Sequence, residues 1–201
     1  MKDWKGNAKS IFAQLGASSH SSDERQSQDY YATDPMAAEL LQQIEDIPKD
    51  KPVWECAAGE RHLADVFEKA GYKVHATDIV KRTENVMVED FLMFRGHNFC
   101  FDGTIITNPP YRYAEQFVMH ALTYTAPGNK VCMFLRLNFL EGKRRKELFR
   151  SFPPKRVWVS SSRIQCAKNA DFGKYTSSAS AYAWFVWEVG YKGETTLKWF
   201  N

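Results

Sequence analysis

One short stretch of the chain places side chains in a pattern that could do chemistry, Asn108-Pro109-Pro110-Tyr111. It follows the apolar run 103–106, which predicts a buried strand. Because two prolines cannot continue a strand and each favours extended geometry in the residue before it, the stretch forms a stiff turn at the strand end. The turn holds an amide, a backbone carbonyl and an aromatic ring in fixed relation, which suits a planar substrate carrying an amino group. An Asn-Pro turn by itself is also an ordinary strand ending, so the other motifs must decide.

Acidic side chains are expected at the ends of three earlier strands. In open α/β sheets, ligands bind beyond the carboxyl ends of the strands, so these acids and the turn would share one site. Acidic ends with a glycine turn suit a ligand that has hydroxyls, an amine and a positive charge. They suit pyrophosphate poorly, because the turn has no lysine and no run of glycines. The groups in chain order are Glu55 through Gly59 after the first strand, Asp78 after the second, and Asp90 with Phe91 after the third.

The elements that must position these residues follow from hydrophobic periodicity. Strands alternate with helices along most of the chain, which predicts a mainly parallel sheet covered by helices on both faces. The chain closes on two strands joined by a loop, which predicts an antiparallel hairpin at the sheet edge. The fold class is therefore α/β with a seven-stranded sheet. The expected helices are 36–47, 63–70, 113–124 and 143–149, and the expected strands are 53–57, 72–78, 86–88, 101–107, 131–135, 156–159 and 181–189.

Length and composition indicate one soluble domain. The chain has 201 residues, a hydrophobic share of 44% and a net charge of +3, which permits a polyanionic partner without requiring one. Residues 1–28 are polar and predict a poorly ordered arm ahead of a single domain at 29–201.

No membrane span and no signal peptide are expected, which favours a cytoplasmic protein. No metal site or disulfide scaffold is expected either, because no Cys-x-x-Cys pair exists among Cys56, Cys100, Cys132 and Cys166.

In these motifs the sequence resembles the S-adenosylmethionine-dependent methyltransferases that modify amino groups, specifically the DNA adenine-N6 methyltransferases. Residues 108–111 match that family's catalytic tetrapeptide. Residues 55–59 are similar to its first cofactor motif, and residues 29–33 are similar to the motif that precedes it. Because the cofactor motif comes before the catalytic one, the order is similar to the gamma arrangement. The small size of the chain and the segment 181–187 resemble the compact phage-encoded members.

The resemblance implies a Rossmann-like methyltransferase domain, S-adenosyl-L-methionine as cofactor and DNA as partner. It implies that Asn108 and Pro109 accept hydrogen bonds from the target amino group, while Tyr111 stacks on a base flipped out of the duplex. It also implies that Asp78 binds the cofactor's ribose and Asp90 its adenine amino group. The catalytic residues so implied are Asn108, Pro109, Pro110 and Tyr111. The cofactor-binding residues so implied are Tyr30, Tyr31, Thr33, Glu55, Ala57, Gly59, Asp78, Ile79, Asp90, Phe91 and Asn108.

Basic residues in two places are candidates for nucleic-acid contact. A charge run on one helix is often only a solvated face, but a polyanionic substrate favours phosphate contact. The loop 163–178 carries residue types that contact phosphates and bases, so it is the candidate target-recognition element. The candidates are Lys143, Arg144 and Arg145 on the helix, and Arg163, Lys168 and Lys174 in the loop.

One residue departs from the family pattern. Arg61 stands where a second small residue is usual, so its side chain is expected to swing away or to pair with Glu60 or a phosphate. The alternatives to DNA adenine are RNA adenine and a protein glutamine as substrates, or a non-catalytic nucleic-acid-binding protein that kept the fold. Residues 1–50 are too short for the helical domain usual in the glutamine-modifying enzymes. A monomer, a homodimer and a restriction partner all stay open.

Overall fold

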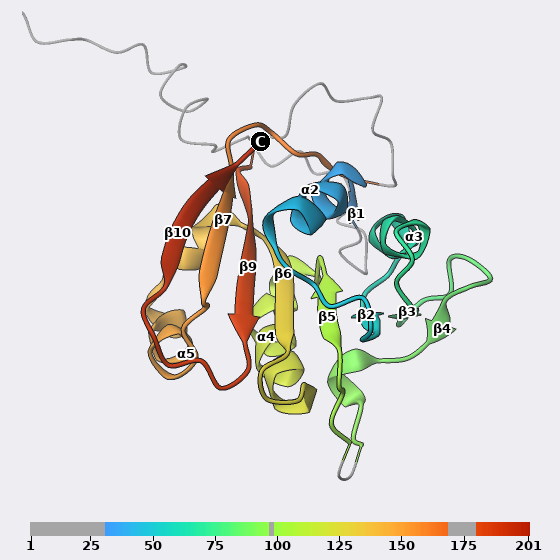
Figure 1. The fold of residues 1–201 in the computed structure, drawn as a ribbon, viewed down its shortest axis with the longest axis horizontal. Helices are drawn as coiled ribbons and strands as arrows, with labels where there is room; N and C mark the ends of the chain where they lie inside the picture. Colours follow the sequence, from blue (N-terminus) through green and yellow to red (C-terminus); the bar gives the residue numbers. More distant parts are fainter. Residues whose placement is uncertain (1–30, 97–98, 169–179) are drawn as a thin grey trace, which may run out of the picture.

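An eight-stranded sheet forms the centre of the structure (Figure 1), a computed structural model that describes residues 31–96, 99–168 and 180–201. The predicted arm at 1–28 lies outside these residues. In spatial order the strands are β10 (Thr196–Phe200), β7 (Arg156–Ser160), β9 (Tyr182–Glu188), β6 (Lys130–Arg136), β5 (Thr104–Thr107), β2 (Val53–Glu55), β3 (Val74–Asp78) and β4 (Met87–Val88). All neighbours pair in parallel except β9, which is antiparallel to β6 and β7, so the predicted mainly parallel sheet is confirmed.

The predicted count of seven strands is wrong, because β10 adds an eighth strand to the sheet. β7 and β9 pair antiparallel as predicted, but they do not form the sheet edge, since β10 pairs in parallel with β7 on its outer side. Within β10, Thr196 to Trp199 are exposed and only Phe200 is buried. Backbone hydrogen bonds rather than an apolar pattern define such an edge strand, so hydrophobic periodicity does not reveal it.

Helices cover both faces of the sheet, as the sequence predicts (Figure 1). The helices are α2 (Met36–Ile44), α3 (His62–Lys69), α4 (Ala114–Tyr124) and α5 (Lys146–Ser151). Successive residues of a strand point to opposite faces, so Ile105 packs with α4 and α5 while Ile106 packs with α2 and α3. The helix predicted at 143–149 is in two pieces, a 3-10 turn and α5. The 3-10 turns are η1 (Phe91–Met93), η2 (Tyr111–Tyr113), η3 (Leu137–Leu140) and η4 (Lys143–Arg145).

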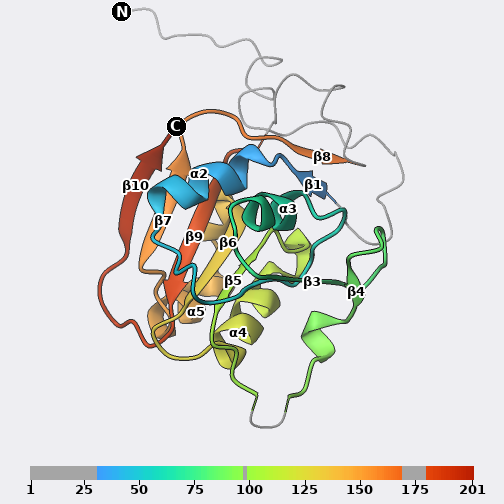
Figure 2. The same cartoon turned by 45° about the vertical axis from the view of Figure 1, so that its right-hand side comes forward.

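A second sheet of two strands is formed by β1 (Tyr31–Thr33) and β8 (Cys166–Lys168) (Figure 2). The two strands are antiparallel, and Thr33 lies opposite Cys166. β8 falls inside the predicted loop 163–178, whose residues from 169 onward lie outside the described part of the chain. The small sheet thus joins the start of the described chain to a segment that precedes β9.

A buried carboxylate ties the end of α2 to the main sheet. Glu45 is 4% exposed and accepts hydrogen bonds from Arg156 and Trp158 of β7 and, at 2.9 Å, from Lys130 of β6. Burial by itself raises the pKa of Glu45, but the hydrogen bonds from these three side chains outweigh burial and lower the pKa to about 2. The ionised form of Glu45 therefore stabilises the fold.

The substitution Glu45→Gln is expected to lower the free energy of unfolding at neutral pH by about 3 kcal/mol, because it removes the counter-charge of Arg156 and Lys130. Since folding lowers the pKa of Glu45, its contribution is complete above the ordinary value of 4.5 and is lost as the pH falls toward about 2. Urea unfolding from neutral to acidic pH measures both effects, with the exposed Glu84→Gln as control. A wild type and a Glu45→Gln variant with equal pH dependence of stability would contradict this account.

Candidate active site

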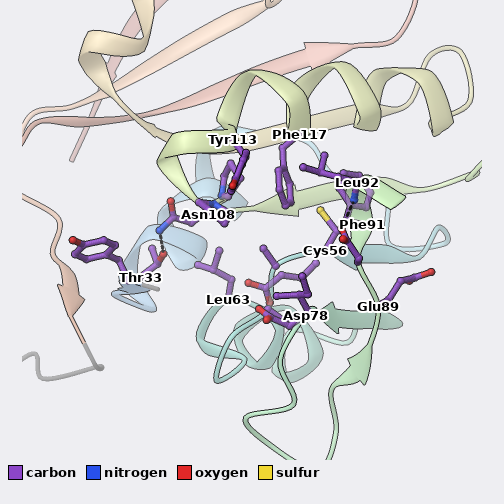
Figure 3. A pocket seen from close by; sticks show the side chains of 18 of the residues that line it. Thr33, Cys56, Leu63, Asp78, Glu89, Phe91, Leu92, Asn108, Tyr113 and Phe117 are labelled. Atoms are coloured by element: carbon purple, nitrogen blue, oxygen red, sulfur yellow. Dashed lines mark hydrogen bonds between the residues drawn. The ribbon is translucent and has the colours of Figure 1, made fainter. Parts of the chain in front are cut away.

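A cavity of about 480 Å³ lies beyond the carboxyl ends of β2 to β5 (Figure 3). The predicted catalytic and cofactor-binding residues line it, apart from Gly59 and from Tyr30, which is outside the described residues. The structure therefore brings these residues together, while their roles stay predictions. The predicted residues in the cavity wall are Tyr31, Thr33, Glu55, Ala57, Asp78, Ile79, Asp90, Phe91, Asn108, Pro109, Pro110 and Tyr111.

Glu55, at the end of β2, is a buried carboxylate in the cavity wall. Its Oε2 atom accepts a hydrogen bond of 2.7 Å from the backbone N–H of Ala64, in the first turn of α3. The positive end of the helix dipole favours negative charge at that place. Full burial nevertheless raises the pKa of Glu55 well above its ordinary value. Ionisation of Glu55 therefore destabilises the fold, and a buried carboxyl group with a shifted pKa in a cavity wall is a candidate functional residue.

The substitution Glu55→Gln tests the burial of this carboxylate. Because folding raises the pKa of Glu55, the wild type loses stability as the pH rises from the ordinary value of 4.5 through the folded pKa. Glu55→Gln keeps an oxygen acceptor for Ala64 but cannot ionise, so it is expected to unfold at a higher temperature than wild type at neutral pH. Below about pH 4 the wild type and Glu55→Gln should unfold at the same temperature. Thermal unfolding across this range is the measurement, and a wild type more stable than the variant at neutral pH would argue against the account.

Asp78, at the end of β3, is buried and held by three donors. The N–H of Gly59 donates to its Oδ2 atom at 2.8 Å, while the N–H of Val80 and the Nη1 atom of Arg82 donate to Oδ1 at 2.9 and 3.1 Å. Gly59 has a φ of +54°, a left-handed conformation that glycine adopts without strain. The glycine turn thus positions Asp78, which keeps acceptor capacity for a further donor.

Arg61 turns away from the cavity, which is one of the outcomes expected from the sequence. Its buried guanidinium donates to Asp65 at 2.9 Å and to the backbone carbonyl of Asn85 at 2.7 Å, and it pairs with Glu68 at 2.5 Å. These bonds tie the first turns of α3 to the segment before β4. The charge of Arg61 is therefore paired outside the cavity wall.

The residues after β4 lie in different environments. The exposed Asp90 accepts a hydrogen bond of 3.0 Å from the N–H of Leu92 and so begins η1. Phe91 is buried and packs edge-on against Trp54, with 5.3 Å between ring centroids. Glu89, which sequence reasoning misses, also lines the cavity, and burial raises its pKa. Its place directly after β4 is the signal that would have identified it.

Asn108 directly follows β5 and lies in the cavity wall (Figure 3). Its Nδ2 atom donates to the Oγ1 atom of Thr33 at 2.7 Å and lies 3.8 Å from the Sγ atom of Cys166. Its Oδ1 atom is buried and has no hydrogen-bond partner within the part of the chain that the structure describes. Because an unpaired buried acceptor costs roughly 1–3 kcal/mol, this oxygen marks a place where a donor is expected to bind.

Tyr111 is held by two residues that sequence reasoning does not assign to the site. Its hydroxyl lies 2.9 Å from that of Tyr182, and the guanidinium of Arg136 lies 4.2 Å from its ring centroid. The ring of Tyr31 is a third neighbour, at 5.6 Å. Burial raises the pKa of Tyr111 well above its ordinary value, so its hydroxyl stays protonated. Sequence reasoning misses Tyr182 and Arg136 because both belong to strands whose apolar pattern indicates core.

The predicted nucleic-acid residues do not share one environment. Arg145 donates to the backbone carbonyls of Phe139 and Asn138 and lies over the ring of Phe139, so it stabilises η3. Arg112, exposed directly after Tyr111, is a further basic residue that the charge pattern of the sequence does not single out. Lys143, Arg144 and Arg163 are exposed, Lys168 belongs to β8, and Lys174 lies outside the described residues.

The wall of the cavity includes the buried thiol of Cys56. Burial raises the pKa of Cys56 well above its ordinary value, so the thiol in the wall is not a thiolate nucleophile. Over residues 31–96, 99–168 and 180–201, no three His, Cys, Asp or Glu side chains form a group that could hold a metal ion.

None of the helices in those described ranges is long and apolar enough to cross a membrane.

No protein-family profile and no curated protein sequence matches the chain. Solved structures do match it in fold. A proposed RNA methyltransferase from Pyrococcus horikoshii gives a TM-score of 0.60 at 17% identity, over 90% of this chain and 98% of that one. A modification subunit of a proposed type I restriction enzyme from Vibrio vulnificus gives 0.57 at 13% identity, over 93% of this chain and 48% of that one.

A third neighbour is a proposed class I S-adenosylmethionine-dependent methyltransferase from Listeria monocytogenes, with a TM-score of 0.56 at 14% identity, over 82% of this chain and 63% of that one. The chain thus spans less than two thirds of the Listeria and Vibrio proteins. At these identities the likeness concerns the fold. The chain has the Rossmann-like fold of the class I S-adenosylmethionine-dependent methyltransferases.

Proposed function

We propose that this chain transfers the methyl group of S-adenosyl-L-methionine to the N6 amino group of adenine in DNA. The observation that carries the proposal is the buried Oδ1 atom of Asn108, which has no hydrogen-bond partner among the described residues and lies at a cavity whose other half is acidic. A substrate amino group would supply the missing donor. The methyltransferase fold of the solved neighbours supports the proposal.

The acidic half of the cavity fits this cofactor. Four carboxylates line it, and a volume of about 480 Å³ is within the range of small-molecule sites. S-adenosylmethionine carries positive charge on its sulfur and its amino group, and when bound it supplies a methyl group that the sulfonium activates. The carboxylates are Glu55, Asp78, Glu89 and Asp90. The residues proposed to hold the cofactor are Tyr31, Glu55, Ala57, Asp78, Ile79, Asp90 and Phe91.

Asn108 and Pro109 would act on the target nitrogen. The N6 nitrogen of adenine is a weak nucleophile, because its lone pair is delocalised into the ring. If Asn108 Oδ1 accepts one of its hydrogens and the Pro109 carbonyl the other, the nitrogen is favoured in a pyramidal form. The same acceptors stabilise the positive charge that develops on the nitrogen, and the excess proton then leaves to solvent. Alignment and charge stabilisation suffice, without a strong base.

Exposed basic residues support a nucleic-acid substrate. Arg112 follows β5, Lys143 and Arg144 follow β6, and Arg163 follows β7. Because these three strands are parallel to one another, their carboxyl ends lie at the edge of the sheet where Asn108 also lies.

A base within a duplex cannot reach the amide of Asn108, so the target base must flip out, and the ring of Tyr111 would stack on it.

RNA adenine and protein glutamine remain the alternative substrates, since both carry an amino group that the same acceptors would hold. The neighbours include a proposed RNA methyltransferase as well as a modification subunit of a proposed restriction enzyme. The resemblance of residues 29–33 and 108–111 to the DNA adenine motifs favours DNA.

The substitution Asn108→Ala is expected to lower the methyl-transfer rate by about 100-fold or more, because it removes the acceptor for the N6 hydrogen. Cofactor affinity, measured by calorimetry, should be retained. The matched control is Asn138→Ala, at an exposed asparagine in η3. An Asn108→Ala variant that methylates DNA at the wild-type rate would refute the proposed role.

The double substitution Arg112→Gln with Lys143→Gln is expected to weaken DNA binding uniformly across sequences. If each side chain contacts one phosphate, the slope of log K against log salt should become shallower by about 0.9 per residue. Titration of labelled duplex at several salt concentrations measures the slope. The control is Lys73→Gln, exposed just before β3 at the opposite end of the strands. An unchanged slope in the double variant would place the phosphate contacts elsewhere.

A further inference from the structure

The amide of Asn108 is held by one cross-strand pair of the small β1–β8 sheet. Thr33 and Cys166 lie opposite each other in the register of that sheet. The Nδ2 atom of Asn108 donates to Thr33 Oγ1 at 2.7 Å and lies 3.8 Å from Cys166 Sγ. An amide nitrogen has two hydrogens, so this pair can engage both of them. The carbonyl oxygen is then the atom of this amide that has no partner in residues 31–96, 99–168 and 180–201.

The orientation of this amide decides whether the site is productive. An asparagine side chain can rotate by half a turn, which exchanges its oxygen with its NH2 group. In the exchanged orientation the NH2 group would face the target amino group, donor against donor. Thr33 is 4% exposed, so solvent does not compete for its hydroxyl. Burial raises the pKa of Cys166 to about 11, so the thiol stays neutral and repels neither the amide nor the substrate.

We propose that Thr33, supported by Cys166, is a positioning residue that orients the Asn108 amide so that its oxygen faces the target nitrogen. This inference rests on the function proposed above. Among the described strands, β1 and β8 pair only with each other, and this pairing brings Thr33 and Cys166 to the amide of Asn108. The inference gives Thr33 a role distinct from the cofactor contact that the sequence predicts.

The substitution Thr33→Val removes the hydroxyl and keeps the shape, whereas Thr33→Ser keeps the hydroxyl. In Thr33→Val, kcat is expected to fall by about 100-fold, as for a misaligned reacting group, while calorimetric cofactor affinity stays unchanged. Thr33→Ser should restore most of kcat. Equal losses in the two variants, or a loss confined to cofactor affinity, would overturn the inference.

A second comparison uses Asn108→Asp, because a carboxylate presents an oxygen in either orientation. Adding Thr33→Val to Asn108→Asp should then cost little further activity, and an undiminished loss would overturn the inference. The side-chain amide signals of Asn108 in 15N NMR give a readout without turnover: Thr33→Val should shift them and speed their hydrogen exchange. Identical amide signals in wild type and Thr33→Val would also overturn it. Wild-type transfer to DNA, assayed alongside, tests the proposed function separately.

Discussion

Parallel strands bring their carboxyl ends to one edge of a sheet, and the whole cavity depends on this constraint. Glu55, Asp78 and Asn108 each stand at or directly after the end of a different strand, and the pairing of β3, β2 and β5 places them side by side. Short turns then fix each group, as the N–H of Gly59 fixes Asp78. The chemistry of the cavity is therefore a consequence of sheet topology more than of any single helix.

The two halves of the cavity differ in the polar groups that line them. Carboxylates gather on the side of β2 to β4, where burial raises the pKa of Glu55 and Glu89. The side of β5 carries the amide of Asn108 and the ring of Tyr111, and the guanidinium of Arg136 lies over that ring. Under the proposed function, the first half would hold the cationic cofactor and the second half the uncharged amino group of the substrate. Glu45, in contrast to Glu55 and Glu89, has a lowered pKa, and its ionised form stabilises the fold.

Much of this arrangement could be predicted from the sequence, because strand ends and glycine turns have local signatures. Residues 108–111 and the acids after three strands can be assigned to one site from the sequence alone. The strand β10 could not, since an exposed edge strand lacks an apolar pattern. Nor could the contacts of Thr33 and Tyr182, which join residues 75 and 71 positions apart in the sequence. Long-range side-chain contacts of this kind depend on packing, which has no local signal. The contact between Arg61 and the backbone carbonyl of Asn85 is a similar case, because Asn85 lies in the segment before β4 and not near Arg61 in the sequence.

The proposed function depends on one contact, in which the Asn108 oxygen that lacks a partner among the described residues receives the amino group of adenine in DNA. The most direct test is incubation of the whole chain with methyl-labelled S-adenosylmethionine and, in separate reactions, duplex DNA, RNA or a protein extract, followed by enzymatic digestion and separation of the products. The proposed function predicts that the label appears in N6-methyladenine from DNA. Label found only in RNA, in protein or in cytosine, or in none of the products, would contradict it.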